Sequence, residues 1–366
     1  MRKMNIGIIG CGNISSIYFK TMKSFDVLNV VACADIIPER AKASAKEFNI
    51  PRAYTVKELL ANHEIDIVVN LTIPKAHAEV ALAAIKAGKH VYGEKPLAIN
   101  RADGDKILKA AKAKGVRVGS APDTFLGAGI QTCRKIIDDG LIGEPVAATA
   151  FMTCHGHESW HPDPDFYYQP GGGPMFDMGP YYLTALVNLI GPIKSVNGIT
   201  RITFPQRLIT SKPKHGTKIK VNTATHIAGT MDFANGAVGT IITSFDIWSA
   251  NLPHIEIHGT EGSLSVPDPN GFGGIVKLYQ PKKREWKEIN HSHGYQENSR
   301  GLGVADMAKS ILVKRPHRAS GDLAYHVLDI MSAFEESSKK GKFIKLGSTC
   351  ARPKAFPVEL KRGELD

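Results

Sequence analysis

The stretch MNIGIIGCGNIS, residues 4 to 15, decides the fold of this chain. It begins as a short apolar run that is typical of a buried strand, and it then turns through Gly10 and Gly12. A helical stretch follows, and a second apolar run, VLNVVACAD, ends on Asp35. The order of strand, tight glycine turn, helix, strand and acid predicts a βαβ unit that binds a dinucleotide.

The residues of this unit have expected contacts with the dinucleotide. Gly10 makes the tight turn, and Gly12 lets the backbone approach the pyrophosphate, which the helix N-terminus binds through its amides. The same turn carries Asn13 and Ile14, which we expect beside the cofactor. Asp35 is expected to accept hydrogen bonds from the adenosine ribose.

The residues around Asp35 favour NAD over NADP. A carboxylate at this position repels a 2′-phosphate, and Ile36 stands where an NADP-binding chain usually has a phosphate donor. Arg40 follows one helical turn later, where it can stack on the adenine. We therefore predict NAD as the cofactor.

The alternation of strands and helices continues along the first third of the chain. Further strands are expected in DIVVNLT (66–72), HVYGEKP (90–96) and VRVGSAP (116–122), separated by helices over residues 75–87 and about 101–114. This pattern predicts an α/β fold in which residues 1–122 form an NAD-binding Rossmann domain with a doubly wound parallel sheet.

The remainder of the chain shows a different pattern. Its apolar runs alternate with turn residues, in ATHIAGTMDF (224–233), GAVGTIITSFDIW (236–248) and HIEIHG (254–259). We predict an α+β domain over residues 123–346, built on a large, open, mostly antiparallel sheet and used for substrate binding and oligomerisation. Residues 347–366 contain prolines and show no periodicity, so we expect a tail along the surface.

Composition limits the classes of protein to which the chain can belong. Its 366 residues suffice for two domains, and 43% apolar with 22% charged residues is typical of a globular protein. The longest apolar run is too short to span a membrane, and five scattered cysteines indicate a reducing cytoplasm. The net charge is +11, but the basic clusters lack interleaved aromatic residues. We expect no nucleic-acid partner and no membrane partner.

The stretch GGGPMFDMGPYY, residues 171–182, combines an acid and a phenol. Asp177 and Tyr181 are spaced i and i+4, so they share one face if the segment is helical, although a proline between them bends the axis. The three glycines are expected to let the backbone turn in close to a site. Two structural alternatives remain: Asp177 could cap a helix, and Tyr181 could pack in the core. Tyr182 is expected to be a packing residue.

Just upstream, HGHESWHPDPDFYYQP (155–170) is rich in histidines, acids and aromatic residues. A metal site is one interpretation, but no histidine spacing fixes a coordination geometry, and we predict no metal. A sugar-binding loop is the better interpretation, since an aromatic ring can stack on the C–H face of a pyranose. The expected contacts are Trp160, His161 and Asp163.

Three motifs together resemble the Gfo/Idh/MocA family of NAD(P)-dependent sugar oxidoreductases, which includes glucose–fructose oxidoreductase and inositol dehydrogenase. They are GCGNIS (10–15), GEKPLA (93–98) and GGGPMFDMGPYY (171–182). The segment NLTIPKAH also looks like the family's Thr-Pro-x-x-His turn. The resemblance implies cofactor contacts from Thr72 and His77.

The resemblance also implies the catalytic residues. Lys95 matches the lysine beside the nicotinamide and the reacting hydroxyl, with Glu94 next to it at the cofactor. The family usually places a catalytic histidine four residues after the acid that matches Asp177. This chain has Tyr181 there, as glucose–fructose oxidoreductase and dimeric dihydrodiol dehydrogenase do, and so resembles a tyrosine-containing variant of the family.

Tyr181 is thus the expected base, and Asp177 the residue that fixes the substrate. A free phenol has a pKa of about 10, so activity near neutrality predicts a pKa lowered by about 2 to 3 units, with the Lys95 ammonium as its cause. If the phenol only packs, the base is to be sought among the three histidines of the preceding loop, which are His155, His157 and His161.

These residues predict an enzyme: an NAD-dependent dehydrogenase that oxidises a secondary ring hydroxyl of a sugar or glycoside to a ketone. A glucoside oxidised to its 3-keto form is the preferred version, because the aromatic loop suits a pyranose that carries an aglycone. An inositol or polyol substrate is the alternative, and a non-catalytic, NAD-bound sensor is the rival from another class. Because family members bury the open sheet face by pairing, the resemblance implies a homodimer or homotetramer.

Overall fold

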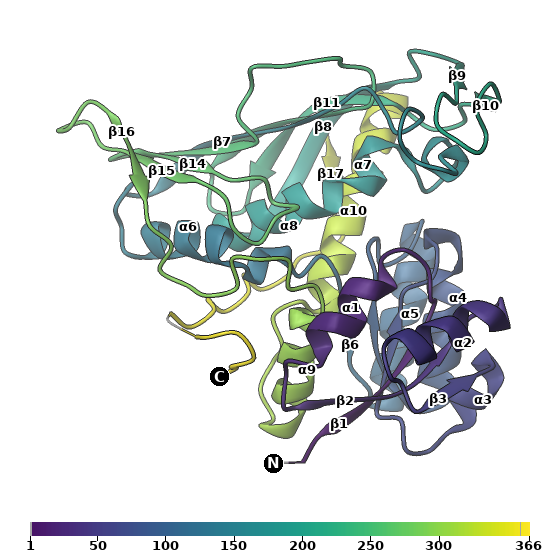
Figure 1. The fold of residues 1–366 in the computed structure, drawn as a ribbon. Coiled ribbons are helices and arrows are strands. Elements are labelled where there is room, and N and C mark those ends of the chain that lie inside the picture. The colour runs from purple at the N-terminus through teal and green to yellow at the C-terminus, as the bar shows by residue number, and fades with distance from the viewer. Residues whose placement is uncertain (1, 359) are drawn as a thin grey trace.

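The computed structural model describes residues 2–358 and 360–366, and the chain gathers around two separate sheets that we name the first and second domains (Figure 1). In the described part of the first domain, six parallel strands lie in the order β3-β2-β1-β4-β5-β6. They are β1 Met4–Ile9, β2 Leu28–Ala34, β3 Arg52–Tyr54, β4 Ile67–Asn70, β5 His90–Gly93 and β6 Val118–Ser120. This confirms the predicted doubly wound parallel sheet. The strand order reverses between β1 and β4, so ligands are expected at the carboxyl ends of these two strands.

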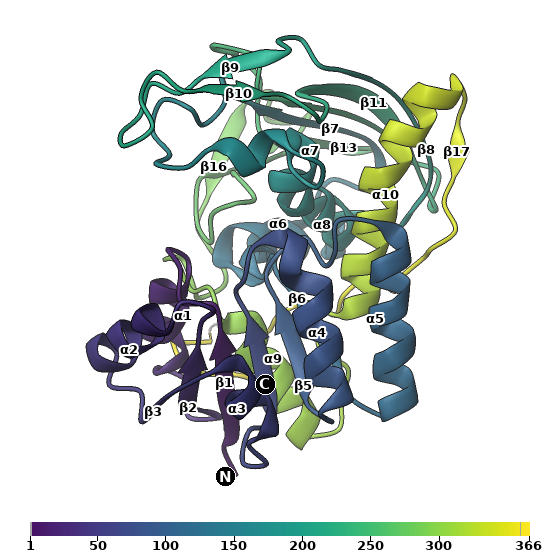
Figure 2. The ribbon, with the colours of Figure 1, turned by 90° about the vertical axis from the view of Figure 1, so that its right-hand side faces the viewer.

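The helices of the first domain cover both faces of its sheet, as Figure 2 shows. They are α1 Ser15–Met22, α2 Pro38–Glu47, α3 Val56–Ala61, α4 His77–Lys86 and α5 Arg101–Lys114. Local sequence explains their beginnings. The Thr55 hydroxyl accepts a hydrogen bond from the Glu58 amide at the start of α3, and the Glu58 carboxylate accepts one from the Thr55 amide. Asn100 accepts a bond from the Asp103 amide at the start of α5.

The second domain has a large and mostly antiparallel sheet, as predicted. In its described residues, nine strands lie in the order β16-β15-β14-β13-β7-β12-β11-β8-β17, and only the β7–β12 pair is parallel. They are β7 Pro145–Thr153, β8 Ile193–Arg201, β11 His226–Phe233, β12 Val238–Ser244, β13 Ile255–Gly259, β14 Ser263–Val266, β15 Val276–Tyr279, β16 Trp286–Ile289 and β17 Ile344–Lys345. A separate hairpin joins β9 Gln206–Leu208 to β10 Lys218–Lys220.

Helices lie along one face of the second sheet (Figure 1). They are α6 Ala128–Asp138, α7 Gly173–Asp177, α8 Gly179–Leu189 and α10 Gly321–Lys340, while α9 Leu302–Leu312 lies lower, beside the first domain. The other face is open, and it leaves Ile199 and Val238 exposed, at 67% and 57% of their surface.

Helix α10 packs on both domains (Figure 2). It contacts β8 of the second sheet along one part of its length, and α5 and β6 of the first domain along another. Ion pairs strengthen this contact, because Arg101 at the start of α5 reaches Asp329 at 2.6 Å and Glu336 at 2.7 Å. The chain thus returns to the first domain after building the second sheet, and the division at residues 122 and 123 stays a prediction from sequence.

After β17, the described part of the tail first packs on α6 of the second domain, and its last residues lie against the first domain, where Gly363 meets Ser24. The carbonyl of Pro353 accepts a hydrogen bond from Arg134 of α6, and the Phe356 amide donates one to Gln131 of the same helix. None of the helices in the described ranges is both long and apolar enough to cross a bilayer.

Candidate active site

The glycine turn after β1 has the shape that a bound pyrophosphate requires. Gly10 has φ of +102°, and a side chain there would lie 2.6 Å from the carbonyl group of Leu71, so only glycine fits. A side chain added at Gly12 would meet no protein atom within 4 Å, which leaves open space in front of the turn. Helix α1 begins after Ile14 without a side-chain cap, and although the Ser15 amide donates to the Gly12 carbonyl, the N-terminal end of the helix is open to an anion. The residues present therefore fit a dinucleotide.

Asp35 is held firmly at the end of β2. One of its carboxylate oxygens accepts a hydrogen bond from the Cys11 amide at 2.7 Å, and the other accepts one from the Ile37 amide at 2.9 Å. Each oxygen keeps a lone pair with which it can accept a ribose hydroxyl. Ile36 is 91% exposed beside it, and Arg40 lies exposed on α2. The carboxylate and the apolar neighbour thus occupy the positions that the sequence predicts for a site preferring NAD.

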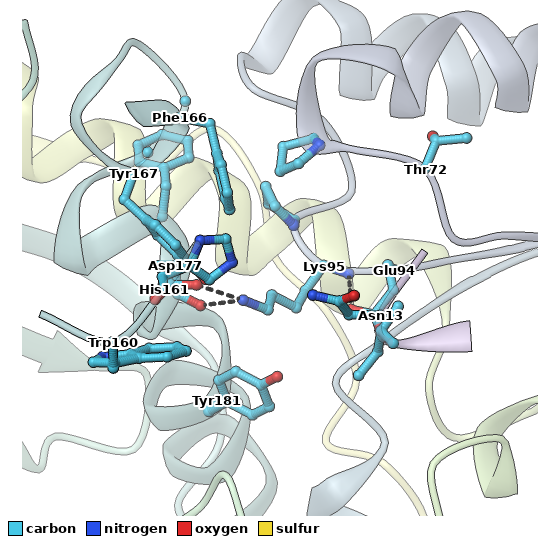
Figure 3. Close-up of a pocket in the computed structure, with 16 residues that line it drawn as sticks. Asn13, Thr72, Glu94, Lys95, Trp160, His161, Phe166, Tyr167, Asp177 and Tyr181 are labelled. Carbon is cyan, nitrogen blue, oxygen red and sulfur yellow. Dashed lines mark hydrogen bonds and ion pairs between the residues drawn. The ribbon is translucent and has the colours of Figure 1, made fainter. Parts of the chain in front are cut away.

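A cavity of about 400 Å³ lies between the two domains, next to the glycine turn (Figure 3). The first domain lines it with Asn13, Ile14, Thr72, Glu94 and Lys95. The second domain contributes Trp160, His161, Phe166, Tyr167, Asp177 and Tyr181. Most of the side chains predicted from sequence as catalytic or binding therefore meet in one place.

At the centre of this cavity, Lys95 spans the gap between the domains (Figure 3). Its Nζ donates to Asp177 twice, to Oδ1 at 2.8 Å and to the main-chain carbonyl at 2.7 Å. Burial alone would raise the pKa of Asp177, but the Lys95 ammonium and a bond from His157 lower it to about 2. Asp177 in turn raises the pKa of Lys95 against the effect of burial. The pair is therefore ionised across the physiological range.

His157 is a second partner of Asp177, and the sequence did not predict this contact. From the sequence, His157 was considered only as an alternative base. Its Nε2 lies 3.1 Å from Asp177 Oδ2, and its ring packs against Tyr167 and Phe245 at centroid distances of 4.2 and 4.6 Å. Its Nδ1 is buried without a hydrogen-bond partner among the described residues. Asp177 is thus held from two sides, by a cation and by an imidazole.

Tyr181 lines the cavity, but its pKa is shifted in a direction that differs from the expectation. Its ring is almost wholly buried, and Lys95 Nζ lies 5.3 Å from the ring centre. Burial raises the pKa of Tyr181, and although Lys95 and Arg300 lower it, the net direction is upward. The predicted lowering of the Tyr181 pKa is wrong, because the desolvation of the phenolate outweighs the attraction of the two cations.

The helix that was expected to carry both Asp177 and Tyr181 is divided into two. Asp177 ends α7 and Tyr181 belongs to the first turn of α8, whose axis starts anew after Met178. Both side chains still line the cavity. Tyr182 is buried and its hydroxyl lies 3.1 Å from His254 Nδ1, which agrees with a packing role.

The glycine triplet 171–173 agrees with the expectation in two of its three positions. Gly171 and Gly172 do line the cavity. Gly173, however, has φ of +77°, and a side chain there would lie 2.6 Å from the carbonyl oxygen of Ala224. At this position, glycine is required by packing against the strand region before β11, and not by the approach of a ligand.

The aromatic loop contributes a partly different set of residues from the predicted one. Trp160 is 60% exposed at the cavity and His161 lines it, as expected. Asp163 points elsewhere: it pairs with Lys214 at 2.6 Å and does not line the cavity, so we withdraw it as a substrate contact. A short 3₁₀ turn, Asp165–Tyr168, reverses the chain and brings Tyr167 inward instead.

Two further residues that were expected to contact the cofactor form hydrogen bonds with other residues of the chain. His77 is buried, with Nδ1 2.7 Å from the Pro96 carbonyl and Nε2 2.9 Å from the Thr72 carbonyl, so it joins the two loops that line the cavity. We correct its assignment from cofactor contact to support of these loops. Glu94 lines the cavity while accepting bonds from the Tyr18 hydroxyl at 2.7 Å and from the Lys95 amide at 3.0 Å.

The remaining histidine of the loop, His155, lies away from the cavity. It stacks on Trp248 with a centroid separation of 3.4 Å. Within the described residues, no group of three or more His, Cys, Asp or Glu side chains is arranged to hold a metal ion.

With this geometry established, comparisons with known proteins identify the relatives of the chain. The model described as "Oxidoreductase family, NAD-binding Rossmann fold" matches residues 4–121, and the GFO/IDH/MocA C-terminal domain matches residues 130–265. The chain belongs to the Gfo/Idh/MocA family. It is therefore an oxidoreductase with an NAD-binding Rossmann domain, as the sequence motifs indicate.

Characterised members of the Gfo/Idh/MocA family are similar over most of the chain. The levoglucosan dehydrogenase of Pseudarthrobacter phenanthrenivorans is 27% identical, over 72% of this chain and 73% of its own length. The myo-inositol 2-dehydrogenase of Thermotoga maritima is 25% identical, over 71% of this chain and 74% of its own. A solved structure of levoglucosan dehydrogenase with NADH shares the fold, with a TM-score of 0.81 and 23% sequence identity. The match covers 95% of this chain and 100% of the other chain.

Proposed function

We propose that the protein is an NAD-dependent dehydrogenase that oxidises a secondary ring hydroxyl of a sugar or glycoside to a ketone. One observation carries the proposal: Lys95, Asp177 and Tyr181 meet in one cavity beside the dinucleotide-binding turn. A charged lysine, a carboxylate and a phenol around one open space can orient a hydroxyl and remove its proton.

The residues of the chain divide this work as follows. NAD, when bound, supplies the acceptor for the hydride. Tyr181 takes the hydroxyl proton, which requires its phenolate form. Lys95 stabilises the phenolate of Tyr181 before the proton transfer and the negative charge that develops on the substrate oxygen during it, and Asp177 secures the charge of Lys95. Asp177 keeps lone pairs on both oxygens and accepts a hydrogen bond from a neighbouring hydroxyl, which fixes the ring.

The lining of the cavity supports a sugar as the substrate. The rings of Trp160 and Phe166 are 60% and 40% exposed where they border the cavity, so they can stack on pyranose C–H faces or on an aglycone. His161 stands between them as a hydrogen-bonding group. A glucoside oxidised to its 3-keto form is our preferred substrate and product, because the aromatic border extends beyond the space that one ring fills.

An inositol or another polyol is the second candidate, and the name of the Thermotoga maritima relative favours it. The name of the other relative, levoglucosan dehydrogenase, favours a sugar. A non-catalytic, NAD-bound sensor would not need the lysine, acid and phenol to be arranged together, so the cluster favours an enzyme.

The test is a panel of alkyl and aryl glucosides, free sugars, levoglucosan and inositols, with NAD reduction followed by absorbance. We expect glucosides to give the highest kcat/KM, with a ketone product that mass spectrometry and NMR assign to one ring carbon. Inositol oxidation without glycoside oxidation would overturn the preferred substrate. Tight NAD binding without turnover of any member of the panel would favour the sensor.

Assembly and location are further proposals. The exposed face around Ile199 and Val238 supports a homodimer or homotetramer that pairs these sheets. The cysteines of the described residues are all free, which supports a reducing, cytoplasmic location. Light scattering of the purified protein tests the oligomeric state, and fractionation of its source cells tests the cytoplasmic location.

A further inference from the structure

Tyr181 contacts a second cation that lies outside every motif of the sequence. The guanidinium carbon of Arg300 lies 6.0 Å from the centre of the Tyr181 ring, while Lys95 Nζ lies 5.3 Å from the same centre. Lys95 follows β5 of the first domain, and Arg300 directly precedes Gly301 and helix α9. The phenol is therefore flanked by two cations that come from distant parts of the chain.

The Arg300 side chain is held in place by neutral groups. Its Nη2 donates to Asn270 Oδ1 at 2.6 Å and its Nη1 donates to Asn298 Oδ1 at 3.0 Å. Among the ion pairs formed by the described residues, none includes Arg300, whereas Arg207 and Arg318 each pair with two carboxylates. Amide oxygens hold the guanidinium, and the carboxylates of Asp123 and Glu94 act on it without forming an ion pair, so it remains able to stabilise the phenolate.

The loop that carries Arg300 is also anchored. Asp123 Oδ2 accepts hydrogen bonds from the amides of Gly301 and Gly303, at 2.8 and 2.9 Å, directly after the arginine. The Arg300 carbonyl accepts a bond from the Thr21 hydroxyl of α1. Main-chain anchors at Arg300 and directly after it, together with amide acceptors at the tip, hold the guanidinium beside Tyr181.

We propose that Arg300 is a positioning residue of the reaction. Its guanidinium stabilises the phenolate of Tyr181, so that Arg300 and Lys95 together stabilise the negative charge of the base. This inference rests on the proposed function, in which Tyr181 is the base. Arg300 does not line the cavity, so it acts on the substrate only through the phenol. When the proton passes from the substrate hydroxyl to the phenolate oxygen, the charge that Arg300 stabilises disappears from Tyr181.

All charged groups near the phenol enter this balance. Burial raises the pKa of Tyr181, Lys95 and Arg300 lower it, and Glu94 raises it. Tyr181 in return raises the pKa of Arg300, against the effect of burial. Tyr167, which also lines the cavity, remains neutral because burial raises its pKa well above the ordinary value of a phenol. Loss of Arg300 therefore removes one of two stabilising cations and leaves the destabilising carboxylate in place.

The experiment reads the phenol directly and needs no turnover. We would place 3,5-difluorotyrosine, a more acidic phenol, at position 181 and titrate it by ¹⁹F NMR in the full chain with arginine, lysine or glutamine at position 300. Arg300→Gln can keep a hydrogen bond to the two asparagines but lacks the charge, whereas Arg300→Lys keeps the charge. Arg201→Gln, at an exposed position on β8, is the matched control for the loss of an arginine.

We expect Arg300→Gln to raise the midpoint of the phenol by about one unit, which is a tenfold change in the phenolate fraction. Arg300→Lys should recover most of this shift, and Arg201→Gln should not move the midpoint. An unchanged midpoint in folded Arg300→Gln would overturn the proposal, even if activity falls. If Arg300→Gln does not fold, Asn270→Ala replaces it, because this variant keeps the charge but releases the guanidinium, and it should raise the midpoint by a smaller amount.

Kinetics then separate this inference from the proposed function. With Tyr181 as the base, the alkaline rise of kcat should move to higher pH in Arg300→Gln, with an unchanged plateau. If the midpoint moves while Tyr181→Phe keeps normal turnover, the base assignment fails and the contact between Arg300 and Tyr181 stands.

Discussion

Lys95 donates two hydrogen bonds to one residue, binding both the carboxylate and the main-chain carbonyl of Asp177. Lys95 follows β5 of the first domain, and Asp177 ends α7 of the second domain. One ammonium therefore fixes the distance between the cofactor side and the substrate side of the cavity. It is also the electrostatic centre on which three of the following predictions depend.

Lys95→Met should leave NAD bound and abolish most turnover, because the ammonium acts on charge that develops during the reaction. The measurement combines NAD titration by fluorescence with single-turnover kinetics. The exposed Lys86 of α4 offers a control, since Lys86→Met removes a charge at a distance from the cavity. Loss of NAD binding with normal residual chemistry would mean that Lys95 only holds the cofactor.

Tyr181→Phe should keep the fold and the NAD affinity but lower turnover by about 10²- to 10⁴-fold, the usual contribution of a general base. Tyr182→Phe, at the neighbouring position, should cost little because that hydroxyl contacts His254 and does not line the cavity. The base works as a phenolate and burial raises the pKa of Tyr181, so the wild-type rate should rise with pH into the alkaline range. This rise should be absent from Tyr181→Phe. Equal pH profiles for the two proteins would assign the phenol to packing and direct attention to His157.

Asp177 should make the stability of the protein depend on pH in the acid range. Its pKa in the folded chain is about 2, below the ordinary value of 3.8, so its contribution is fully present above about pH 4 and is lost as the pH falls towards 2. The shift corresponds to about 2 kcal/mol. Urea unfolding between pH 2 and pH 5 should show a shallower pH dependence for Asp177→Asn than for wild type, while the surface variant Asp105→Asn should follow wild type. Parallel curves for Asp177→Asn and wild type would contradict the ionised pair.

Asp35 should determine the choice of cofactor. We expect wild type to prefer NAD over NADP, because a carboxylate held by two backbone amides cannot move away from a 2′-phosphate. Asp35→Ser should narrow or reverse the preference, as measured by the ratio of kcat/KM for the two cofactors. Wild-type turnover that is as fast with NADP as with NAD would show that the ribose assignment is wrong.

The sequence predicts well those features that depend on neighbours along the chain. The glycine turn and the alternation of strands and helices are local patterns, and the structure confirms them. The meeting of Lys95 with Asp177 follows from motifs that a family resemblance makes recognisable.

Features that depend on tertiary folding could not be predicted in this way. His157 reaches Asp177 because the loop folds back on itself, and Arg300 reaches Tyr181 from a segment without any motif. The direction of the Tyr181 pKa was predicted wrongly for the same reason, since desolvation depends on how completely the fold covers a side chain. Asp163 was misplaced because a 3₁₀ turn changes which residues of the loop face inward.

Helix α10, which packs on both domains, has a consequence for how ligands enter and leave. The two halves cannot swing apart as on a hinge without breaking the bonds of Arg101 to Asp329 and Glu336. The width of the cleft is then set during folding and not during the catalytic cycle. We expect exchange of the substrate to depend instead on the loop of residues 155–170, which places the exposed ring of Trp160 beside the cavity. Product release should therefore follow the local motion of a short segment, so that substitutions in this loop change the residence time of the product while the two domains keep their relative orientation.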